Sequence, residues 1–600
     1  MSDELIKQQE IDFQLYEVLD TESLCDRERF ADHNKETFGA VLDTANKLAS
    51  ELFAPHNAKA DSDEPSFDGE KVSMIDDVKV AFDAYNEAGF VAGRYDYDEG
   101  GMQLPETIMT ACSGYFLAAN PSTTAYPFLT MGAANVIRSF ASQELKETFL
   151  PPMLSGEFTG TMALTEPHAG SGLADIRTSA TLAEDGTYRI KGSKLYISGG
   201  DHELTSNIVH LVLAKIPGGP AGVGGISLFV VPKYRLDDSG KPAERNDVVL
   251  AGLIHKLGYR GTTSTALTFG ENGDCHGYLV GEPHQGLRYM FKMMNEARLG
   301  VGFGAAVIGY RGYRYSLDYA KERTQGRLPP KTNPTDPTVP IVEHGDVKRM
   351  LLAQKAYSEG AMSLCFFGAR LVDDVHTAKT EEERKSAFEL LDLLTPVVKA
   401  WPSEYGPKAN DLAIQVLGGS GYTREYPVEQ CWRDNRLNPI HEGTNGIQAL
   451  DLMTRKIWQK NGAGLALLQK QIMSDFSQAK GAESQKLIAS VGSYVAQLEP
   501  LLGTIGKALQ SEQLLAVISN AHSFMNVFGQ IVMSWIWIRQ AIKAEQALSG
   551  EVTEQEKAFY LGKIQTAKYF VNWELPAIKR DLELLTQLDS SCSDMQTEWF

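Results

Sequence analysis

The sequence predicts an α+β chain of several domains, in which helices precede and follow one β-rich region. Apolar residues recur at helical spacing before about residue 155 and again after about residue 286. Between these positions the chain consists of short β-forming runs separated by Gly, Pro and Asp. At roughly 100–200 residues per domain, the 600 residues allow about three to five structural units.

The helical pattern at the start of the chain extends over about residues 32–154. In residues 36–52, for example, the apolar side chains stand three to four positions apart, which is the spacing of one buried helix face. The residues before this region, up to about position 29, are expected to form an additional N-terminal helix.

The β-rich region covers about residues 156–280. Its clearest runs are residues 188–190, 208–213, 226–231 and 265–269, with turn signals such as Asp185-Gly186 between them. No long helical pattern separates these runs, so the region predicts an antiparallel β domain rather than a series of βαβ units.

Helical periodicity returns at about residue 286 and continues to about residue 459, with one interruption at residues 326–340. Five prolines in that interval exclude a helix there and predict an exposed connector. From about residue 463 to 588 the pattern is helical again. We therefore expect an N-terminal helical extension, an N-terminal α domain, a middle β domain, a second α domain built as a helix bundle and an additional C-terminal helical domain, at residues 1–35, 36–158, 159–283, 284–462 and 463–600.

Composition excludes several classes of protein. The net charge of −20 argues against DNA or RNA as the main partner, because neutralising phosphates requires clustered Lys and Arg. The six cysteines form no C-x-x-C pair, and the polar start is not a secretory signal. Polar residues interrupt the most apolar stretch, residues 514–538, so we expect a buried amphipathic helix there and no integral membrane segment. A cytoplasmic location is the default.

Two motifs lie in the β-rich region. Residues 162–172, MALTEPHAGSG, combine small residues, hydroxyls and a proline, which allow backbone N–H groups to approach a ligand closely. Residues 194–200, KLYISGG, place Tyr196 and Ser198 on one face of a strand, where a ring and a hydroxyl could contact a planar ligand. Taken singly, a plain turn and an ordinary half-buried strand are the more common interpretations.

Two further motifs lie in the second helical region. Residues 415–422, QVLGGSGY, could form a helix C-cap or admit a pyrophosphate. Residues 438–448, NPIHEGTNGIQ, place Glu442 in a turn before a helix, where burial would suit a general base, although a helix-start Glu often only complements the dipole. The pair His441-Glu442 is not H-E-x-x-H, so no metal site is expected. Neither a Rossmann fingerprint nor a Walker loop is present.

Together these four motifs, in this order and with this α–β–α arrangement, resemble the acyl-CoA dehydrogenase family. The patterns T-E-P-x-A-G-S, K-x-Y-I-S-x-G, Q-x-x-G-G-x-G and I-x-E-G-T-x-x-I-Q are specific only in combination. The resemblance covers about residues 32–456. The extra segments at both ends resemble the long bacterial branch that includes 3-methylmercaptopropionyl-CoA dehydrogenase. The resemblance implies the acyl-CoA dehydrogenase-like fold, in which a β domain stands between two helical domains in the chain, and an additional C-terminal helical domain follows.

The resemblance implies that FAD is the cofactor. Members bind it between the β domain and the second helical domain, and some of the contacts come from a neighbouring subunit. In long relatives the added C-terminal domain covers a face that shorter members use to build a tetramer, so the resemblance implies a homodimer. In this sequence the family's flavin contacts fall on Leu164, Thr165, Tyr196, Ser198, Thr444, Asn445 and Gly446. The contacts from the neighbouring subunit fall on Arg323, Gln415, Gly418 and Gly419. Ser171 matches the serine near the pantetheine arm of CoA, and Arg298 matches an arginine near the CoA nucleotide, although a solvated surface charge is the commoner role of any Arg.

By the same resemblance, Glu442 is the catalytic base. It takes a proton from C2 of an acyl-CoA thioester while C3 gives a hydride to flavin N5, and the product is a trans-2-enoyl-CoA. Some relatives place the base on another helix, immediately before an Arg. Here that position is Ala297, which cannot accept a proton, and Glu296 lies about 100° further around the helix.

The family implies an acyl-CoA substrate, either 3-methylmercaptopropionyl-CoA or a short-to-long straight-chain fatty acyl-CoA. These substrates correspond to DMSP degradation and to fatty acid β-oxidation. An electron-transfer flavoprotein is the expected electron acceptor. Three alternatives remain open at this point: an acyl-CoA oxidase that uses O₂, a flavin-bearing DNA-binding or alkylation-protection homologue, and a flavin-free structural homologue. The net negative charge counts against the second alternative.

Overall fold

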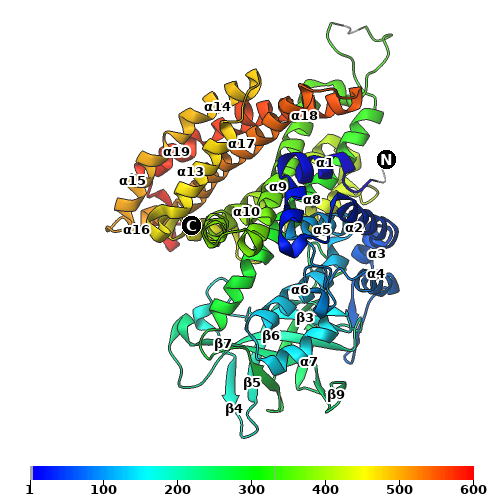
Figure 1. Ribbon diagram of the computed structural model, residues 1–600, viewed down its shortest axis with the longest axis vertical. Helices are drawn as coiled ribbons and strands as arrows, with labels where there is room; N and C mark the ends of the chain where they lie inside the picture. Colours follow the sequence, from blue (N-terminus) through cyan, green and yellow to red (C-terminus); the bar gives the residue numbers. More distant parts are fainter. Residues whose placement is uncertain (1–3, 331–332) are drawn as a thin grey trace. The chain divides into compact units, whose positions relative to one another are not determined.

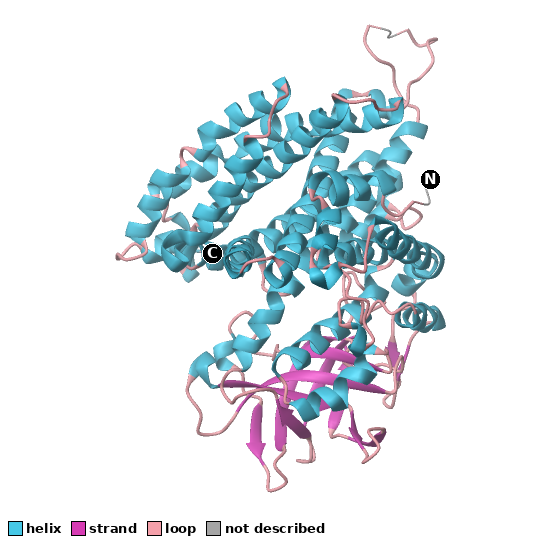
Figure 2. Ribbon diagram, viewed as in Figure 1, coloured by secondary structure: helices cyan, strands magenta, loops and turns pink. Residues whose placement is uncertain are grey.

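The computed structural model describes residues 4–330 and 333–600, apart from the side chains of residues 292–296. The chain divides into two compact units. One comprises Met1–Lys35, Glu106–Gly114 and Arg298–Phe600, and the other Glu36–Pro105 and Tyr115–Ala297. The α+β class is confirmed, since the strands gather in the second unit while the first is helical (Figure 2).

The second unit combines helices with a sheet. Its main helices are α2 (Lys35–Leu48), α4 (Asp76–Glu87), α6 (Pro121–Phe140) and α7 (Gln143–Leu154). The predicted helical face is present in α2, which buries Phe38, Leu42 and Ala45. Asn120 caps α6, because its side chain accepts a hydrogen bond from the Thr123 N–H at 3.1 Å.

This unit also contains an eight-stranded sheet, and the described residues add two sheets of two strands each. Seven strands of the larger sheet lie in the order β10-β11-β5-β12-β7-β6-β3, and β4 pairs with β5 and β6. The strands are β3 (Phe158–Ala163), β4 (Ser179–Leu182), β5 (Tyr188–Ser198), β6 (Asn207–Lys215), β7 (Ile226–Pro232), β10 (Val248–Leu253), β11 (Ser264–Phe269) and β12 (His276–Leu279). Buried aliphatic and aromatic side chains of these strands, including Val212, Phe229 and Phe269, form its core.

Most strand pairs are antiparallel, as predicted, but β3 runs parallel to β6 from Phe158↔Asn207 to Ala163↔Val212. A single parallel pair, Ser179↔Lys215, also joins β4 to β6. The expectation of a purely antiparallel domain is therefore corrected. The parallel pair is possible because β4 and β5 form the crossover between β3 and β6.

Three long helices dominate the first unit: α8 (Gly286–Glu322), which the unit boundary divides, α9 (Gly345–Thr377) and α10 (Glu381–Leu417). The sequence predicts a single interruption of helical periodicity between residues 286 and 459, at residues 326–340, but the structure has further interruptions. The chain turns between α9 and α10, where Thr380 forms a capping box with Glu383. It turns again after α10 and continues into α11 (Val428–Asn435) and α12 (Asn445–Thr454).

The last part of the chain is helical, as predicted. In Figure 1, α17 (Ala521–Leu548) runs beside α18 (Glu554–Tyr569), and it also packs against α12, α14 and α19. Shorter helices complete this region: α13 (Ala463–Phe476), α14 (Ala482–Val495), α15 (Leu498–Ala508), α16 (Leu514–Ser519) and α19 (Lys579–Gln587). The helix predicted over residues 514–538 is interrupted at Asn520, so it begins as α16 and continues as the buried α17.

The N-terminal segment forms α1 (Gln8–Asp12), followed by a π-helical turn at Phe13–Val18 and 3₁₀ turns at Thr21–Asp26 and Glu28–Phe30. In place of the single N-terminal helix expected from the sequence, the segment thus forms one short α-helix followed by π-helical and 3₁₀ turns. Among the helices of the described residues, none combines the length and the apolarity that crossing a bilayer requires.

Candidate functional site

The first two motifs lie side by side in the β-containing unit. The Leu195 N–H donates a hydrogen bond to the Thr165 carbonyl at 2.9 Å, and the Lys194 ammonium donates to the Leu164 carbonyl at 3.0 Å. Leu164 and Thr165 are half-buried and directly follow β3. The structure therefore brings Leu164 and Thr165 together with the strand that carries Tyr196 and Ser198.

Tyr196 occupies an unusual position on β5. Its φ is +61°, a left-handed conformation that costs a residue with a side chain about 1–2 kcal/mol. The pairing of β5 with β11 shifts register beside it, between Leu267↔Lys194 and Thr265↔Ile197. Ile197 is buried, whereas the Tyr196 side chain is 62% exposed and Ser198 is half-buried. The strained backbone conformation thus occurs at Tyr196, whose exposed ring lies two residues before the hydroxyl of Ser198.

A buried ion pair fixes these two segments. Lys194 Nζ lies 2.9 Å from Glu166 Oε1, and the Glu166 carboxylate also accepts from the Arg177 and Thr178 N–H groups and from the Thr178 hydroxyl. Burial raises the pKa of Glu166, but Lys194 and these hydrogen bonds outweigh it and hold the pKa below its usual value. The pKa of Lys194 falls to about 8 because burial outweighs the attraction of Glu166.

Ser171 lies in the loop that follows this ion pair. Glu166 and Ala169 close a tight turn through two backbone hydrogen bonds of 2.9 and 3.1 Å, and both Gly170 and Ser171 are exposed after it. The Ser171 hydroxyl is therefore accessible to a ligand.

Glu442 lies in the helical unit, in the turn between α11 and α12. It has a φ of +52°, so it is also strained, and its side chain is half-buried. Within the described residues, no group donates a hydrogen bond to its carboxylate, and its backbone N–H has no protein acceptor. Both groups are available to a ligand.

The surroundings of Glu442 favour a proton acceptor of raised basicity. Burial raises the pKa of Glu442, while the positive charges of Arg298 and Lys399 act in the opposite direction. Arg298 is only 6% exposed, and its Nη2 lies 3.7 Å from the position that a Cβ on Gly443 would occupy. Its Nε has no partner within the described residues. The interpretation of Arg298 as a solvated surface charge is therefore wrong.

A chain of amide groups holds the turn in place. Asn435 donates to the Ala305 carbonyl of α8 at 3.0 Å and to Asn410 of α10 at 2.7 Å. Asn438 donates to Asn435 at 2.8 Å, and His441 contacts Asn438 at 3.1 Å. The turn is thus tied to two helices that precede it in the chain.

Thr444, Asn445 and Gly446 follow the base directly. The Thr444 hydroxyl accepts from the Ile447 N–H at 3.3 Å and caps α12. The Asn445 side chain is occupied by the protein, because its Oδ1 accepts from Lys399 at 3.2 Å and its Nδ2 donates to Glu404 at 3.3 Å. Gly446 is exposed. Lys399 has no role in the sequence prediction, although a lone Lys in an apolar run was a signal for it.

The residues expected to serve a neighbouring subunit are exposed in this one. Arg323 follows the end of α8, and Gln415, Gly418 and Gly419 lie at the end of α10. One turn before Arg323, the Tyr319 hydroxyl lies 3.4 Å from the Ser420 hydroxyl. Apart from the adjacent residues of the chain, no atom of the described residues lies within 4 Å of a Cβ built on Gly418 or Gly419. The structure therefore brings the α8 end and the glycine turn together and leaves the glycine backbone open.

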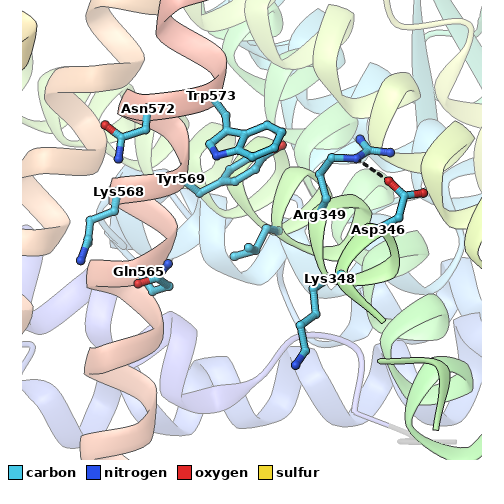
Figure 3. A pocket seen from close by; sticks show the side chains of 10 residues that line it. Asp346, Lys348, Arg349, Gln565, Lys568, Tyr569, Asn572 and Trp573 are labelled. Atoms are coloured by element: carbon cyan, nitrogen blue, oxygen red, sulfur yellow. Dashed lines mark hydrogen bonds and ion pairs between the residues drawn. The ribbon is translucent and has the colours of Figure 1, made fainter. Parts of the chain in front are cut away.

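A cavity of about 510 Å³ lies between the start of α9 and the end of α18 (Figure 3). Trp573 stacks on Tyr569 at its wall, with a centroid distance of 5.8 Å. The basic groups around it are paired: Arg349 with Asp346 and Lys568 with Glu483. None of the predicted site residues lines this cavity, so we do not assign the chemistry to it.

The alternative position for the base lies on α8. Ala297, immediately before Arg298, is buried and carries no acid–base group, and the side chain of Glu296 lies outside the described residues. In the β-containing unit, an exposed aromatic ring beside a hydroxyl is suited to a planar ligand. In the helical unit, taken by itself, the open glycine turn is suited to phosphate groups.

The sequence matches four family models along most of its length. They are the acyl-CoA dehydrogenase N-terminal domain at residues 35–157, the middle domain at 161–271 and the C-terminal domain at 284–457. The fourth, described as acetyl-CoA dehydrogenase C-terminal like, matches residues 468–596.

Similar proteins share nearly the full length of the chain. The 3-methylmercaptopropionyl-CoA dehydrogenase of Ruegeria pomeroyi is 33% identical over 92% of each chain. A butyryl-CoA dehydrogenase of Syntrophomonas wolfei is 34% identical over 99% of each chain. The structure of Caenorhabditis elegans ACDH-11 in complex with C11-CoA has a TM-score of 0.76 at 19% identity, over 99% of this chain and 96% of that one. The chain therefore belongs to the acyl-CoA dehydrogenase family of FAD-dependent oxidoreductases.

Proposed function

We propose that this protein oxidises an acyl-CoA to the trans-2-enoyl-CoA with Glu442 as the catalytic base. The observation that carries this proposal is the state of Glu442. It is a half-buried carboxylate of raised pKa on a strained residue, and it accepts no hydrogen bond within the described residues. An unpaired carboxylate of this kind is suited to take a proton from carbon.

The chain's own groups would perform the proton transfer and stabilise the charge. Glu442 takes the proton from C2, and the electrons of that bond move toward the thioester carbonyl. The Glu442 backbone N–H then donates a hydrogen bond to the thioester oxygen, whose negative charge increases as the proton leaves. When bound, FAD supplies the acceptor for the hydride that leaves C3 and a ribityl hydroxyl for the same oxygen.

We assign the flavin contacts to the residues that the family resemblance predicts. In the β-containing unit these are Leu164, Thr165, Tyr196 and Ser198, with the ring of Tyr196 against the flavin. In the helical unit they are Thr444, Asn445 and Gly446. Asn445 would contribute through its backbone, because Lys399 and Glu404 already bind its side chain.

The CoA contacts differ from the simple expectation in one respect. Ser171 remains the residue proposed to contact the pantetheine arm, since it is exposed. Arg298 is buried against the turn of Glu442, so we propose that it acts on the base rather than on the CoA nucleotide.

We further propose that the active species is a homodimer, in which Arg323, Gln415, Gly418 and Gly419 bind the FAD of the partner subunit. All four residues are exposed, as such a role requires. An electron-transfer flavoprotein is the proposed electron acceptor, and the cytoplasm is the proposed location. The last domain is proposed to form an outer wall of the acyl pocket.

For the substrate we propose 3-methylmercaptopropionyl-CoA or a straight-chain acyl-CoA of short to long chain length, with the short acyl chains as the first to test. The two relatives at 33% and 34% identity are named for short acyl-CoA thioesters. The corresponding processes are DMSP degradation and fatty acid β-oxidation.

The test compares turnover of butanoyl-, octanoyl-, palmitoyl- and methylthiopropionyl-CoA by the purified flavoprotein with an artificial electron acceptor. We expect turnover of at least one of the four. Negligible rates with all of them would contradict the proposed function. Peroxide formation in air without an acceptor would instead identify an oxidase.

A further inference from the structure

Lys399 is a buried cation next to the proposed base. It lies on α10, its exposed fraction is 0%, and its chain neighbours Val398 and Ala400 are buried as well. Within the described residues its ammonium forms no ion pair with a carboxylate. A buried charge without such a partner is costly, because its hydration is lost and is not replaced by a direct opposite charge.

The two hydrogen bonds of Lys399 go to the two ends of one turn. Its Nζ donates to the Asn438 carbonyl at 2.8 Å and to Asn445 Oδ1 at 3.2 Å. Glu442 lies between these residues, at a φ of +52°. The turn is also closed on itself, since the Asn445 N–H donates to the Pro439 carbonyl at 3.0 Å. Lys399 therefore links the two ends of the turn that contains Glu442, the proposed base.

The titratable groups near Lys399 lie on the turn of Glu442 and on helices α8, α9 and α10. The turn contributes Glu442 and His441, and α8 contributes Arg298. Glu404, on α10 itself, is linked through Asn445. The thiol of Cys365 on α9 contacts the neighbouring Val398 carbonyl.

Only some of these titratable groups carry a charge near neutral pH. Burial lowers the pKa of His441 to about 3 and raises that of Cys365, so both stay neutral. Burial lowers the pKa of Lys399, Glu442 raises it and Arg298 lowers it further, with a result of about 7. Lys399 and Arg298 both lower the pKa of Glu442.

We propose that Lys399 is a positioning residue of the proposed reaction: its ammonium holds both ends of the turn that carries Glu442 and keeps a positive charge behind the carboxylate. This inference rests on the proposed function, because it assigns Lys399 to the base named there. The positive charge has a consequence with a definite sign. When it is lost, Glu442 binds its proton more tightly, and a higher pH is needed to free the base.

The test uses the full-length holoenzyme with Lys399→Met, Lys399→Arg and Glu442→Gln, and with Lys385→Met as a control at an exposed position on the same helix. For each variant, kcat, KM and the pH dependence of kcat are measured with the best substrate. Flavin content and the midpoint of thermal unfolding report on folding.

For Lys399→Met we expect kcat to fall by about 10²-fold, the cost typical of a misplaced catalytic group, with a smaller change in KM. The acid limb of its pH profile should move to higher pH. Lys399→Arg keeps the charge, so the acid limb should stay in place and part of the activity should return. Lys385→Met should behave as the wild type.

The inference is overturned if Lys399→Met keeps its pH profile and a kcat within about threefold of the wild type. It is also overturned if activity falls only in parallel with flavin content and thermal stability and Lys399→Arg gives no rescue. The Glu442→Gln variant separates this failure from that of the proposed function. If Glu442→Gln remains active, the base assignment fails and the role of Lys399 fails with it.

Discussion

Glu166 and Lys194 form an ion pair of 2.9 Å whose side chains are 2% and 0% exposed. Each belongs to a different motif, and the pair joins the segment that follows β3 to β5, two residues before the strained Tyr196. These two charged residues thus have a structural role, and they hold in place the neighbours that we assign to the flavin.

Breaking this pair should destabilise the β-containing unit. Glu166→Gln leaves the Lys194 charge buried without its partner, and the loss of one member of such a pair typically costs about 3–5 kcal/mol. We expect a lower unfolding midpoint and reduced flavin content. Glu184→Gln, at an exposed position in the same unit, is the control and should change neither. A Glu166→Gln variant as stable as the control would disprove the structural role.

Tyr196 should matter for the flavin and not for the fold. Its side chain is 62% exposed, so Tyr196→Ala should leave the apoprotein within about 0.5 kcal/mol of the wild type. The holoprotein should lose thermal stability, because weaker FAD binding stabilises the folded state less. Tyr196→Phe keeps the ring and should retain most of the affinity. Equal FAD affinity of the Ala variant and the wild type would exclude the ring contact.

Two buried histidines predict a loss of stability in acid. Burial lowers the pKa of His202 and His210 from 6.5 to about 3. Below pH 6.5 both histidines bind protons in the unfolded chain but stay neutral in the folded chain. The free energy of unfolding is therefore highest above pH 6.5 and decreases as the pH falls toward 3.

The measurement is the unfolding midpoint as a function of pH. His210→Asn removes one titrating group, so its midpoint should depend less steeply on pH across this interval, even if the variant is less stable overall. His255→Asn alters an exposed histidine and serves as the control. An unchanged slope in His210→Asn would show that His210 is not excluded from protonation.

The two ends of the chain are joined by another buried cation. Lys563 on α18 lies 2.6 Å from Glu10 of α1 and 2.8 Å from Glu359 of α9, and its side chain is fully buried. Lys563→Met leaves the buried Glu10 without an ion-pair partner among the described residues and Glu359 with Lys355 alone, so we expect a loss of about 3 kcal/mol in urea unfolding. Lys557→Met on the exposed face of α18 should lose less than about 0.5 kcal/mol. Equal losses in the two variants would contradict the role of this cluster.

The proposed sharing of FAD between subunits can be tested by complementation. Arg323→Ala and Glu442→Gln should each be inactive as homodimers. In a mixed dimer, the Arg323→Ala subunit still has Glu442 and the Glu442→Gln subunit still has Arg323. One of the two sites then combines the intact Glu442 with the intact Arg323 and is competent. We therefore expect activity to appear when the two variants are co-expressed or refolded together. No activity in verified mixed dimers would place Arg323 outside the partner's site.

The sequence predicted the element types well where periodicity is local. The strand runs at residues 208–213 and 226–231 became the buried strands β6 and β7, and the residue 36–52 pattern became α2. It did not reveal the turn between α9 and α10, because two helices that pack together can continue one apolar pattern. The parallel pairing of β3 with β6 also escaped prediction, since it depends on contacts far apart in the sequence.

The candidate site was predicted unevenly for a similar reason. Glu442 and Tyr196 stand in distinctive motifs, and both prove to be strained residues of positive φ. Lys399 and Arg298 stand in no motif. Lys399 binds turn residues that lie 39 and 46 positions further along the chain, and Arg298 packs against the same distant turn. A lone cation in an apolar run, as at Lys399, can indicate burial, but no local pattern shows which distant turn the side chain contacts.

The most direct test of the central claim is the steady-state turnover of Glu442→Gln on an acyl-CoA that the wild type oxidises, measured on protein of equal flavin content. We predict that the variant retains its flavin and loses at least about 10²-fold in kcat, the usual contribution of a positioned general base. Turnover within about tenfold of the wild type, with the flavin still bound, would contradict the assignment of Glu442 as the base.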